Sequence, residues 1–179
     1  RGTRIAEFAR WVREPRGVDV DELDYPGLHE WSVRDLEGFW SAIAEHLGVI
    51  FHDPPTATLG RRDMPGAEWF PGATLNYAEH ALASGPGRED ADVAVIGVIE
   101  AGTERVVTHG ELRDQVARAR AGLVALGVGR GDRVVALAPN SVETLVAFLA
   151  AASLGAVWSS CSPDFGARAV LDRFAQIET

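Results

Sequence analysis

The sequence predicts an α/β protein in which an irregular, partly helical leading segment precedes a regular unit of alternating strands and helices. Seven of the nine prolines and four of the five tryptophans lie before residue 93. From Val93 onward, short β-branched runs alternate with helical patterns of about a dozen residues, which is typical of βαβ units and a parallel sheet. The composition, 46% hydrophobic and 24% charged, is that of an ordinary globular protein.

Two helices are predicted in the leading segment. The first places its apolar residues on one face and is expected to end near Pro15; that face is formed by Ile5, Phe8, Trp11 and Val12. The second is expected to begin with Ser32 as its N-cap and to end at Gly48. Its apolar positions at helical spacing are Leu36, Trp40, Ile43 and Leu47.

Two long loops are expected in the same segment, over residues 19–27 and 52–72, because both stretches are rich in proline, aspartate and glycine. Loops of that length are uncommon in a compact domain unless they wrap another surface. Large aromatic residues are the expected anchors of these loops: Trp31, Phe39, Trp69 and Phe70. A short helix is expected to begin around Leu75-Asn76-Tyr77.

The regular unit opens with residues 93–99, a continuous apolar run that predicts a strand buried on both faces. A turn at Gly102 and a second short strand over residues 105–108 follow. Thr108 and Glu111 have the spacing of a capping box, so a helix is expected to begin there and to end at Gly127.

Residues 133–138 predict the next strand, and Pro139-Asn140-Ser141 the start of another helix. Residues 155–159 predict a further strand, and Asp164 is expected to cap the last helix. The residues expected to face inward on that helix are Val170, Leu171, Phe174 and Ile177. The result would be an incomplete flavodoxin-like parallel sheet of three or four strands with a bare edge, which suggests the front part of a longer protein.

Composition also excludes several function classes. The net charge of −9 disfavours nucleic acid as a partner, because an acidic surface repels phosphates. All 17 basic residues are arginine, so no lysine is present to serve a catalytic role. The single cysteine excludes an internal disulfide and a zinc–cysteine cluster.

No membrane partner is expected. Residues 144–163 form an uncharged run of 20 residues, long enough to cross a bilayer, but it contains Ser153, Gly155 and Pro163 and divides naturally into a helix and a strand. No apolar leader follows the first residues, so a cytoplasmic location is expected.

Several motifs do not support a site. The glycines of residues 127–131 follow a predicted helix and precede a strand, the reverse of a dinucleotide-binding loop. The histidines lack metal-ligand spacing; they are His29, His46, His52, His80 and His109. His109 is interpreted as a helix-start residue, and Cys161 as a buried, inert thiol rather than a nucleophile.

The segment Ser162-Pro163-Asp164-Phe165-Gly166 is the strongest candidate site. It follows a predicted strand and precedes a helix, and ligands of open parallel sheets collect at the carboxyl ends of strands. Small residues permit close backbone approach, and a helix N-terminus favours anions. An ordinary turn capped by Asp164 accounts for the same residues, and the residues alone favour that reading.

An ordered set of segments resembles a known family. Residues 68–79 (EWFPGATLNYAE) resemble the start of short-chain acyl-CoA synthetases. Residues 107–112 (VTHGEL) are similar to the first core motif of the adenylate-forming superfamily, with His109 where tyrosine is usual. Residues 158–166 (WSSCSPDFG), followed by LDRF at 171–174, resemble the acetoacetyl-CoA synthetase subfamily, as do residues 29–33 and 39–40. The resemblance runs from about residue 5 to the end.

The resemblance implies the front part of an ATP-dependent acid–thiol ligase of lipid and fatty acid metabolism. Residues 1–75 would be its helical cap and residues 76–179 the start of its AMP-binding domain. The full-length enzyme would join acetoacetate to coenzyme A through an acyl-adenylate, using ATP and Mg²⁺. The family's phosphate loop and catalytic lysine would lie after residue 179, so the piece alone would be inactive and its partner would be the remainder of its own chain.

Within this chain the resemblance implies no catalytic or metal-binding residue. In related enzymes the segment matching Ser162, Pro163, Asp164, Phe165 and Gly166 lies near the path by which coenzyme A enters, although residue types differ here. Two alternatives stay open: another short-chain acyl-CoA synthetase, for acetate or propionate, and a non-catalytic flavodoxin-like module that acts by binding or assembly.

Overall fold

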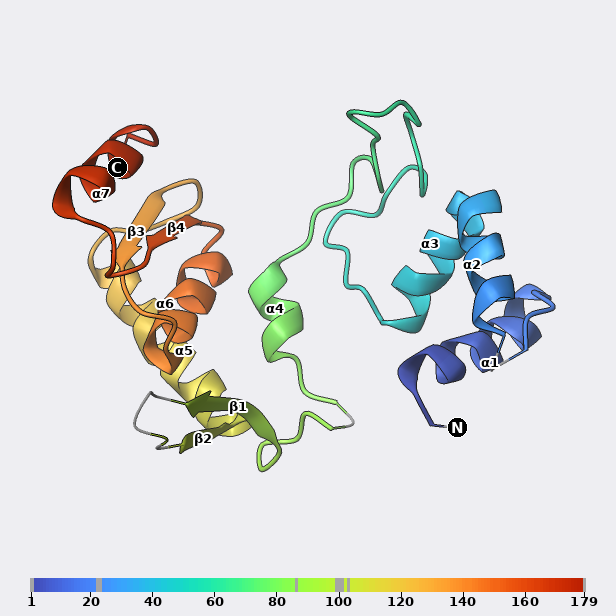
Figure 1. The fold of residues 1–179 in the computed structure, drawn as a ribbon, viewed down its shortest axis with the longest axis horizontal. Coiled ribbons are helices and arrows are strands. Elements are labelled where there is room, and N and C mark those ends of the chain that lie inside the picture. Colours follow the sequence, from blue (N-terminus) through green and yellow to red (C-terminus); the bar gives the residue numbers. More distant parts are fainter. Residues whose placement is uncertain (1, 22–23, 86, 99–101, 103, 179) are drawn as a thin grey trace. The chain divides into compact units, whose positions relative to one another are not determined.

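The computed structural model describes residues 2–21, 24–85, 87–98, 102 and 104–178, which divide into two compact units, Arg1–Leu75 and Asn76–Thr179 (Figure 1). The leading unit contains three helices followed by a long loop, and the second contains strands and helices in alternation. Each unit has its own hydrophobic core. The α/β class predicted from the sequence is therefore confirmed.

Helix α1 spans Arg4–Arg16 and matches the expected first helix. The Thr3 hydroxyl accepts a hydrogen bond from the Ala6 N–H at 3.3 Å, and Gly17, at φ +63°, ends the helix in the left-handed conformation that glycine favours. Ile5, predicted on the inward face, is 51% exposed, because Ala6 and not Ile5 occupies the buried position of the first turn.

The region after α1 differs from the prediction. Helix α2 spans Tyr25–Arg34 and occupies part of the expected 19–27 loop, because the Asp24 carboxylate caps it by accepting from the Gly27 N–H at 2.9 Å. Ser32 is therefore not an N-cap: it lies inside α2, and its hydroxyl donates to the His29 carbonyl at 2.7 Å. Asp35 caps helix α3, Leu36–His46, by accepting from the Gly38 N–H at 2.9 Å.

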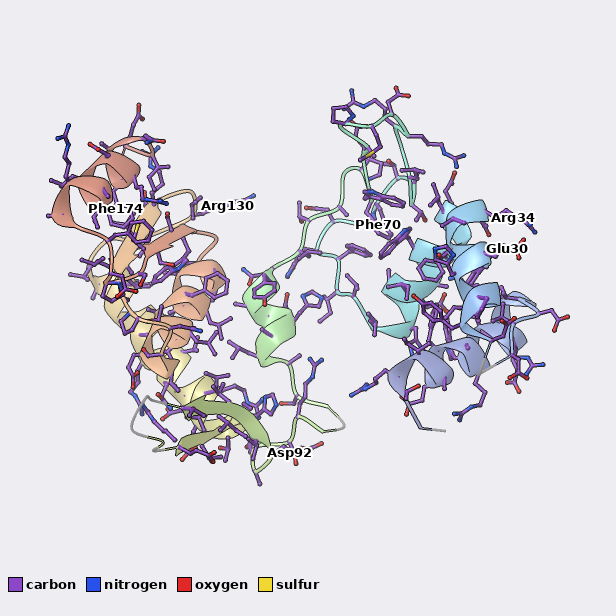
Figure 2. All side chains as sticks on the ribbon, viewed as in Figure 1. Glu30, Arg34, Phe70, Asp92, Arg130 and Phe174 are labelled. Carbon is purple, nitrogen blue, oxygen red and sulfur yellow. The ribbon has the colours of Figure 1, made fainter. Side chains whose placement is uncertain are left out.

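The core of the leading unit combines aromatic rings with the buried aliphatic side chains of Val12, Val20, Leu28 and Ala42. The ring of Phe8 lies 5.8 Å from Phe39, 6.3 Å from Trp31 and 6.2 Å from Trp11, measured between ring centroids. The long loop after α3 is held in the same way (Figure 2): the ring of Phe70 lies 5.4 Å from Phe51. Trp69 lies 5.6 Å from Trp40. The predicted loop over residues 52–72 is confirmed, with Trp69 and Phe70 as anchors. Trp31 and Phe39, also expected to anchor the loops, pack against Phe8 instead.

The second unit begins with helix α4, Tyr77–Leu82, which is capped by Asn76. Strands β1, Val93–Val98, and β2, Glu104–Thr108, pair in antiparallel fashion. The capping box of Thr108 and Glu111 opens helix α5, His109–Ala125, as predicted. Ile99, the expected last residue of the first strand, lies outside the described residues.

Strand β3, Arg133–Leu137, precedes helix α6, Val142–Ser153. Strand β4, Val157–Cys161, precedes helix α7, Ala167–Ala175. Strands β3 and β4 pair in parallel, and α6 is the crossover between them. Strand β4 begins two residues later than expected, because Gly155 adopts φ +70° and closes the end of α6 through the bond from its N–H to the Ala152 carbonyl.

The expected parallel sheet of three or four strands is wrong for the described residues: β3 and β4 form the parallel part, and β1 belongs to a separate hairpin. Only five residues, 99–103, separate β1 from β2 in the sequence, and strands so close in sequence pair antiparallel. Strand β1 is accordingly not buried on both faces; Ile96 is 57% and Val98 63% exposed. Its other face approaches α6 closely, since a Cβ at Gly97 would lie 3.0 Å from the Val142 side chain.

The core of the second unit is aliphatic and lies between α5, α6 and β2. In Figure 1 the β1–β2 hairpin and the β3–β4 pair lie near opposite ends of α5. No helix in the described residues is long and apolar enough to span a membrane. The uncharged run of residues 144–163 is divided between α6 and β4, as expected.

Candidate functional site

The candidate site lies at one edge of the parallel pair. Leu137 and Cys161, the last residues of β3 and β4, are register partners. The N–H of Ala138 donates to the Cys161 carbonyl at 3.1 Å, which extends the pairing by one step. The segments that follow the two strands, residues 138–141 and 162–166, therefore leave the sheet at the same edge, where parallel sheets collect ligands.

The Ser162–Gly166 loop is a turn closed by its own short contacts. The Phe165 N–H donates to the Ser162 carbonyl at 3.1 Å. The Ser162 hydroxyl donates to the Asp164 carboxylate at 2.8 Å. All five residues are exposed, so the loop has a defined shape and is open to a ligand from solvent.

The expectation that Asp164 caps the last helix is wrong. Gly166 is the N-cap residue of α7, and no side chain donates or accepts a capping hydrogen bond there. Asp164 lies two residues too early for that role, and its carboxylate accepts from Ser162 instead. The start of α7 therefore depends on the loop itself for its position.

Phe165 is the one large apolar side chain of this loop, and it is 38% exposed. The guanidinium carbon of Arg173, in the last turn of α7, lies 4.3 Å from the centroid of its ring, the geometry of a cation–π contact. Phe174 follows on the half-buried side of the helix (Figure 2). Leu171, expected to face inward, is 69% exposed.

Cys161 ends β4 and is 6% exposed. The predicted burial of Cys161 is confirmed. Because the side chain is buried, its Sγ atom is shielded from dissolved substrates. The described histidines, cysteine and acids form no group of three or more that could hold a metal ion. His109 occupies the first turn of α5, as expected for a helix-start residue, and its Nδ1 atom is buried without a hydrogen-bond partner.

Sequence reasoning missed an ion pair at the start of α6. Arg105 on β2 pairs with Glu143, and its guanidinium also donates to the Gln115 side chain at 3.3 Å. The pKa of Glu143 is lowered, first by its own backbone N–H, which donates to the carboxylate, and then by the Arg105 and Ser141 side chains. The two partners are separated by 38 residues, so no local pattern predicts this pair.

The ion pair borders a cavity of about 590 Å³ between β1 and the start of α6. Its walls mix apolar and polar side chains: Val95, Ile96 and Val142 line it together with Asn140 and the charged pair Arg105 and Glu143. The cavity lies on the β1–β2 hairpin side of the unit and does not include the Ser162–Gly166 loop.

Comparison with known proteins gives the family. Residues 84–179 match the family described as AMP-binding enzyme, and residues 25–81 match the family described as acetyl-coenzyme A synthetase N-terminus. The acetoacetyl-coenzyme A synthetase of Rhizobium meliloti is 44% identical over 176 residues, 97% of this chain and 26% of that protein. The acetoacetyl-CoA synthetase of Rattus norvegicus is 42% identical over 161 residues, 87% of this chain and 23% of that protein.

Among solved structures, the acetoacetyl-CoA synthetase from Streptomyces lividans is 51% identical, with a TM-score of 0.87. The match covers 98% of this chain and 27% of the solved chain. The chain thus spans about a quarter of the length of the relatives that it matches. Since the first family match covers more than half of its residues, this chain belongs to the AMP-binding enzyme family.

Proposed function

We propose that this chain is the leading part of an ATP-dependent acid–thiol ligase that makes acetoacetyl-CoA from acetoacetate, ATP and coenzyme A. The observation that carries the proposal is the 51% identity and TM-score of 0.87 to a solved acetoacetyl-CoA synthetase over 98% of the chain. Relatives with the same name from Rhizobium meliloti and Rattus norvegicus support it over 97% and 87% of the chain.

Two domains are part of the proposal: a helical cap over residues 1–75 and the start of an AMP-binding domain over residues 76–179. The division of the structure into compact units at Leu75 and Asn76 supports this boundary. The two family matches, over residues 25–81 and 84–179, meet close to the same position.

The reaction has two steps. A carboxylate oxygen of the acid attacks the α-phosphorus of ATP and expels pyrophosphate, which gives the acyl-adenylate. The sulfur of coenzyme A then attacks the acyl carbon, AMP leaves with the electrons of the broken C–O bond, and the thiol proton is released. A free carboxylate is a poor acylating group, so the first step supplies the leaving group that the second needs.

In that chemistry these residues would supply the scaffold and the path of access for coenzyme A, rather than charges that stabilise the transferring phosphate. The sequence has no lysine, and the described residues contain no cluster that could hold a metal ion. Transferring phosphoryl groups need fixed positive charge, which the remainder of the full-length enzyme would supply. The piece alone is therefore expected to be inactive.

The Ser162–Gly166 loop is proposed to border the path of coenzyme A. Its position at the carboxyl edge of β3 and β4, its exposure and its closed shape support this role. In the full-length enzyme, Asp164→Arg should raise the KM for coenzyme A and leave adenylate formation unchanged. Arginine cannot accept the Ser162 hydrogen bond, and its long side chain would obstruct the loop.

The matched control is Asp172→Arg, which makes the same charge change at an exposed position of α7. Adenylate formation is measured as acid-dependent exchange of pyrophosphate into ATP, and thiol transfer as coenzyme A-dependent release of AMP. An Asp164→Arg enzyme with unaltered coenzyme A kinetics would remove the assignment of the loop.

The acid substrate is tested separately. We expect kcat/KM for acetoacetate to exceed that for acetate and propionate by at least about tenfold, since roughly 1.4 kcal/mol of discrimination corresponds to that factor. A second candidate, a ligase for acetate, is favoured by the match of residues 25–81 to the acetyl-coenzyme A synthetase N-terminus. Higher kcat/KM with acetate would select it, and absence of exchange with all three acids would overturn both.

The proposed location is the cytoplasm, without a nucleic acid or membrane partner. The net charge of −9 supports the first exclusion, because it opposes approach to phosphate backbones. Cell fractionation checks the location: recovery of the ligase with washed membranes would contradict it.

A further inference from the structure

The cation–π contact between Arg173 and Phe165 lies at the end of the candidate site where α7 begins. The Ser162–Gly166 loop is anchored at its first half by the hydrogen bond from Ser162 to Asp164. Its second half is held by the backbone bond from the Phe165 N–H to the Ser162 carbonyl at 3.1 Å but has no side-chain hydrogen bond of this kind, because Gly166 begins α7 without a side-chain cap. Phe165 lies in this second half, and 38% of its surface is exposed.

Arg173 supplies the missing anchor. It lies six residues beyond the first residue of α7, and its side chain reaches back toward the start of the helix, the direction in which helical side chains tilt. The guanidinium carbon lies 4.3 Å from the centroid of the Phe165 ring. In the part of the chain that the structure describes, no carboxylate forms an ion pair with Arg173, so its charge is directed at the ring.

We propose that Arg173 is a positioning residue for the thiol-transfer step: it holds the Phe165 ring and, through it, keeps the second half of the Ser162–Gly166 loop in the shape that admits coenzyme A. The inference rests on the proposed function of this loop. It adds a residue seven positions beyond the loop, and a role exerted through another side chain rather than by contact with the substrate.

The test compares Arg173→Leu, Phe165→Leu and the double variant in the full-length enzyme. An exposed cation–π contact has a strength equivalent to about a two- to fivefold change in an equilibrium constant. Arg173→Leu should therefore raise the KM for coenzyme A by roughly that factor, with kcat and pyrophosphate exchange unchanged. Arg173→Lys, which keeps a cation, should recover most of the loss.

The double variant separates positioning from direct contact. If Arg173 acts through Phe165, removing the ring leaves nothing for the guanidinium to hold, and the double variant should be no worse than Phe165→Leu alone. Additive losses would overturn the inference, because they would mean that Arg173 contacts coenzyme A itself. Arg120→Leu, at an exposed position of α5, is the matched control for loss of a surface charge.

Three results keep this inference distinct from the proposed function. Altered coenzyme A kinetics in Phe165→Leu but not in Arg173→Leu would overturn the role of Arg173 and leave the loop assignment standing. Unaltered kinetics in Phe165→Leu, Arg173→Leu and Asp164→Arg would overturn both. A loss of pyrophosphate exchange together with a lower melting temperature in Arg173→Leu would show a structural role and overturn the positioning role.

Discussion

The two units are stabilised by different kinds of core. In the leading unit, large rings pack beside a few aliphatic side chains: Phe8 lies against Trp11, Trp31 and Phe39, which come from three different helices. The buried aliphatic members of this core are Val12, Val20, Leu28 and Ala42. In the second unit the core consists of smaller aliphatic side chains from α4, α5, α6 and β2; the buried members are Ala78, Val107, Leu112, Val116, Val142, Val146, Leu149 and Ala150.

This difference has an energetic consequence. An aromatic side chain buries about 150–250 Å², so its removal leaves a large void in a small core. An aliphatic side chain buries less surface, so its removal leaves a smaller cavity. Truncation of an aromatic ring in the leading unit should therefore cost more than truncation of an aliphatic side chain in the second unit.

The largest effect is expected for Phe8→Ala. Phe8 is 5% exposed, and loss of its ring should lower the free energy of unfolding of the leading unit by about 3–5 kcal/mol. Urea unfolding followed by tryptophan fluorescence measures this loss, because Trp11 and Trp31 lie beside the ring. Phe8→Leu should retain part of the packing and lose less; equal losses in the two variants would contradict the cavity explanation.

A smaller effect is expected for Val116→Ala in α5. Val116 is 2% exposed, and the two methyl groups removed should cost about 2 kcal/mol. Amide hydrogen exchange in α5 and α6 measures this loss within the second unit. Faster exchange in α1 and α3 by the same factor would mean that the two units do not unfold separately, and the contrast between them would lose its basis.

The contrast also explains how far the fold could be predicted. In the second unit, two of the helix starts follow local rules: the Thr108–Glu111 capping box and the Ser141 N-cap form where the sequence predicts a helix to begin, whereas Asp164 does not cap α7. In the leading unit, Asp24 and Asp35 cap α2 and α3, but Ser32 has the same capping chemistry and lies inside a helix. Local residue type could not choose among them, because aromatic packing between helices decides the boundaries.

Pairing between distant segments is harder to predict. The β-branched run of β1 has the composition of a central parallel strand, yet it pairs antiparallel with β2, the strand that follows it closely in the sequence. At the candidate site, the segment Ser162–Gly166 could be found from its place after a strand. The contact between Arg173 and Phe165 and the pair of Arg105 with Glu143 depend on tertiary geometry and leave no sequence pattern.

Helix capping should have an intermediate effect of similar size in both units. Thr108→Ala removes the N-cap acceptor of α5, and Asp24→Ala removes that of α2; each should cost about 1 kcal/mol. Thr108→Ser and Asp24→Asn keep an acceptor and should recover most of the stability. The comparison is made by urea unfolding, and a much larger loss at Asp24 would indicate that α2 depends on its cap more than on the aromatic core.

The smallest effect is a pH dependence confined to the second unit. The pKa of Glu143 lies below its ordinary value of 4.5, because its carboxylate accepts hydrogen bonds first from its own backbone N–H and then from the Arg105 guanidinium. A carboxyl with a lowered folded-state pKa contributes stability that is present above the ordinary value. That contribution is lost as the pH falls through the lowered one.

Both side chains are more than half exposed, so solvent screens the pair and its contribution should stay below about 1 kcal/mol. The expected result is a stability difference between the wild type and Glu143→Gln that is constant at neutral pH, shrinks below pH 4.5 and weakens in high salt. Hydrogen exchange in α6 against pH measures it. Since Glu143 belongs to the second unit, the same substitution should leave exchange in α1 and α3 unchanged at every pH, and an equal response there would contradict the separate stabilisation of the two cores.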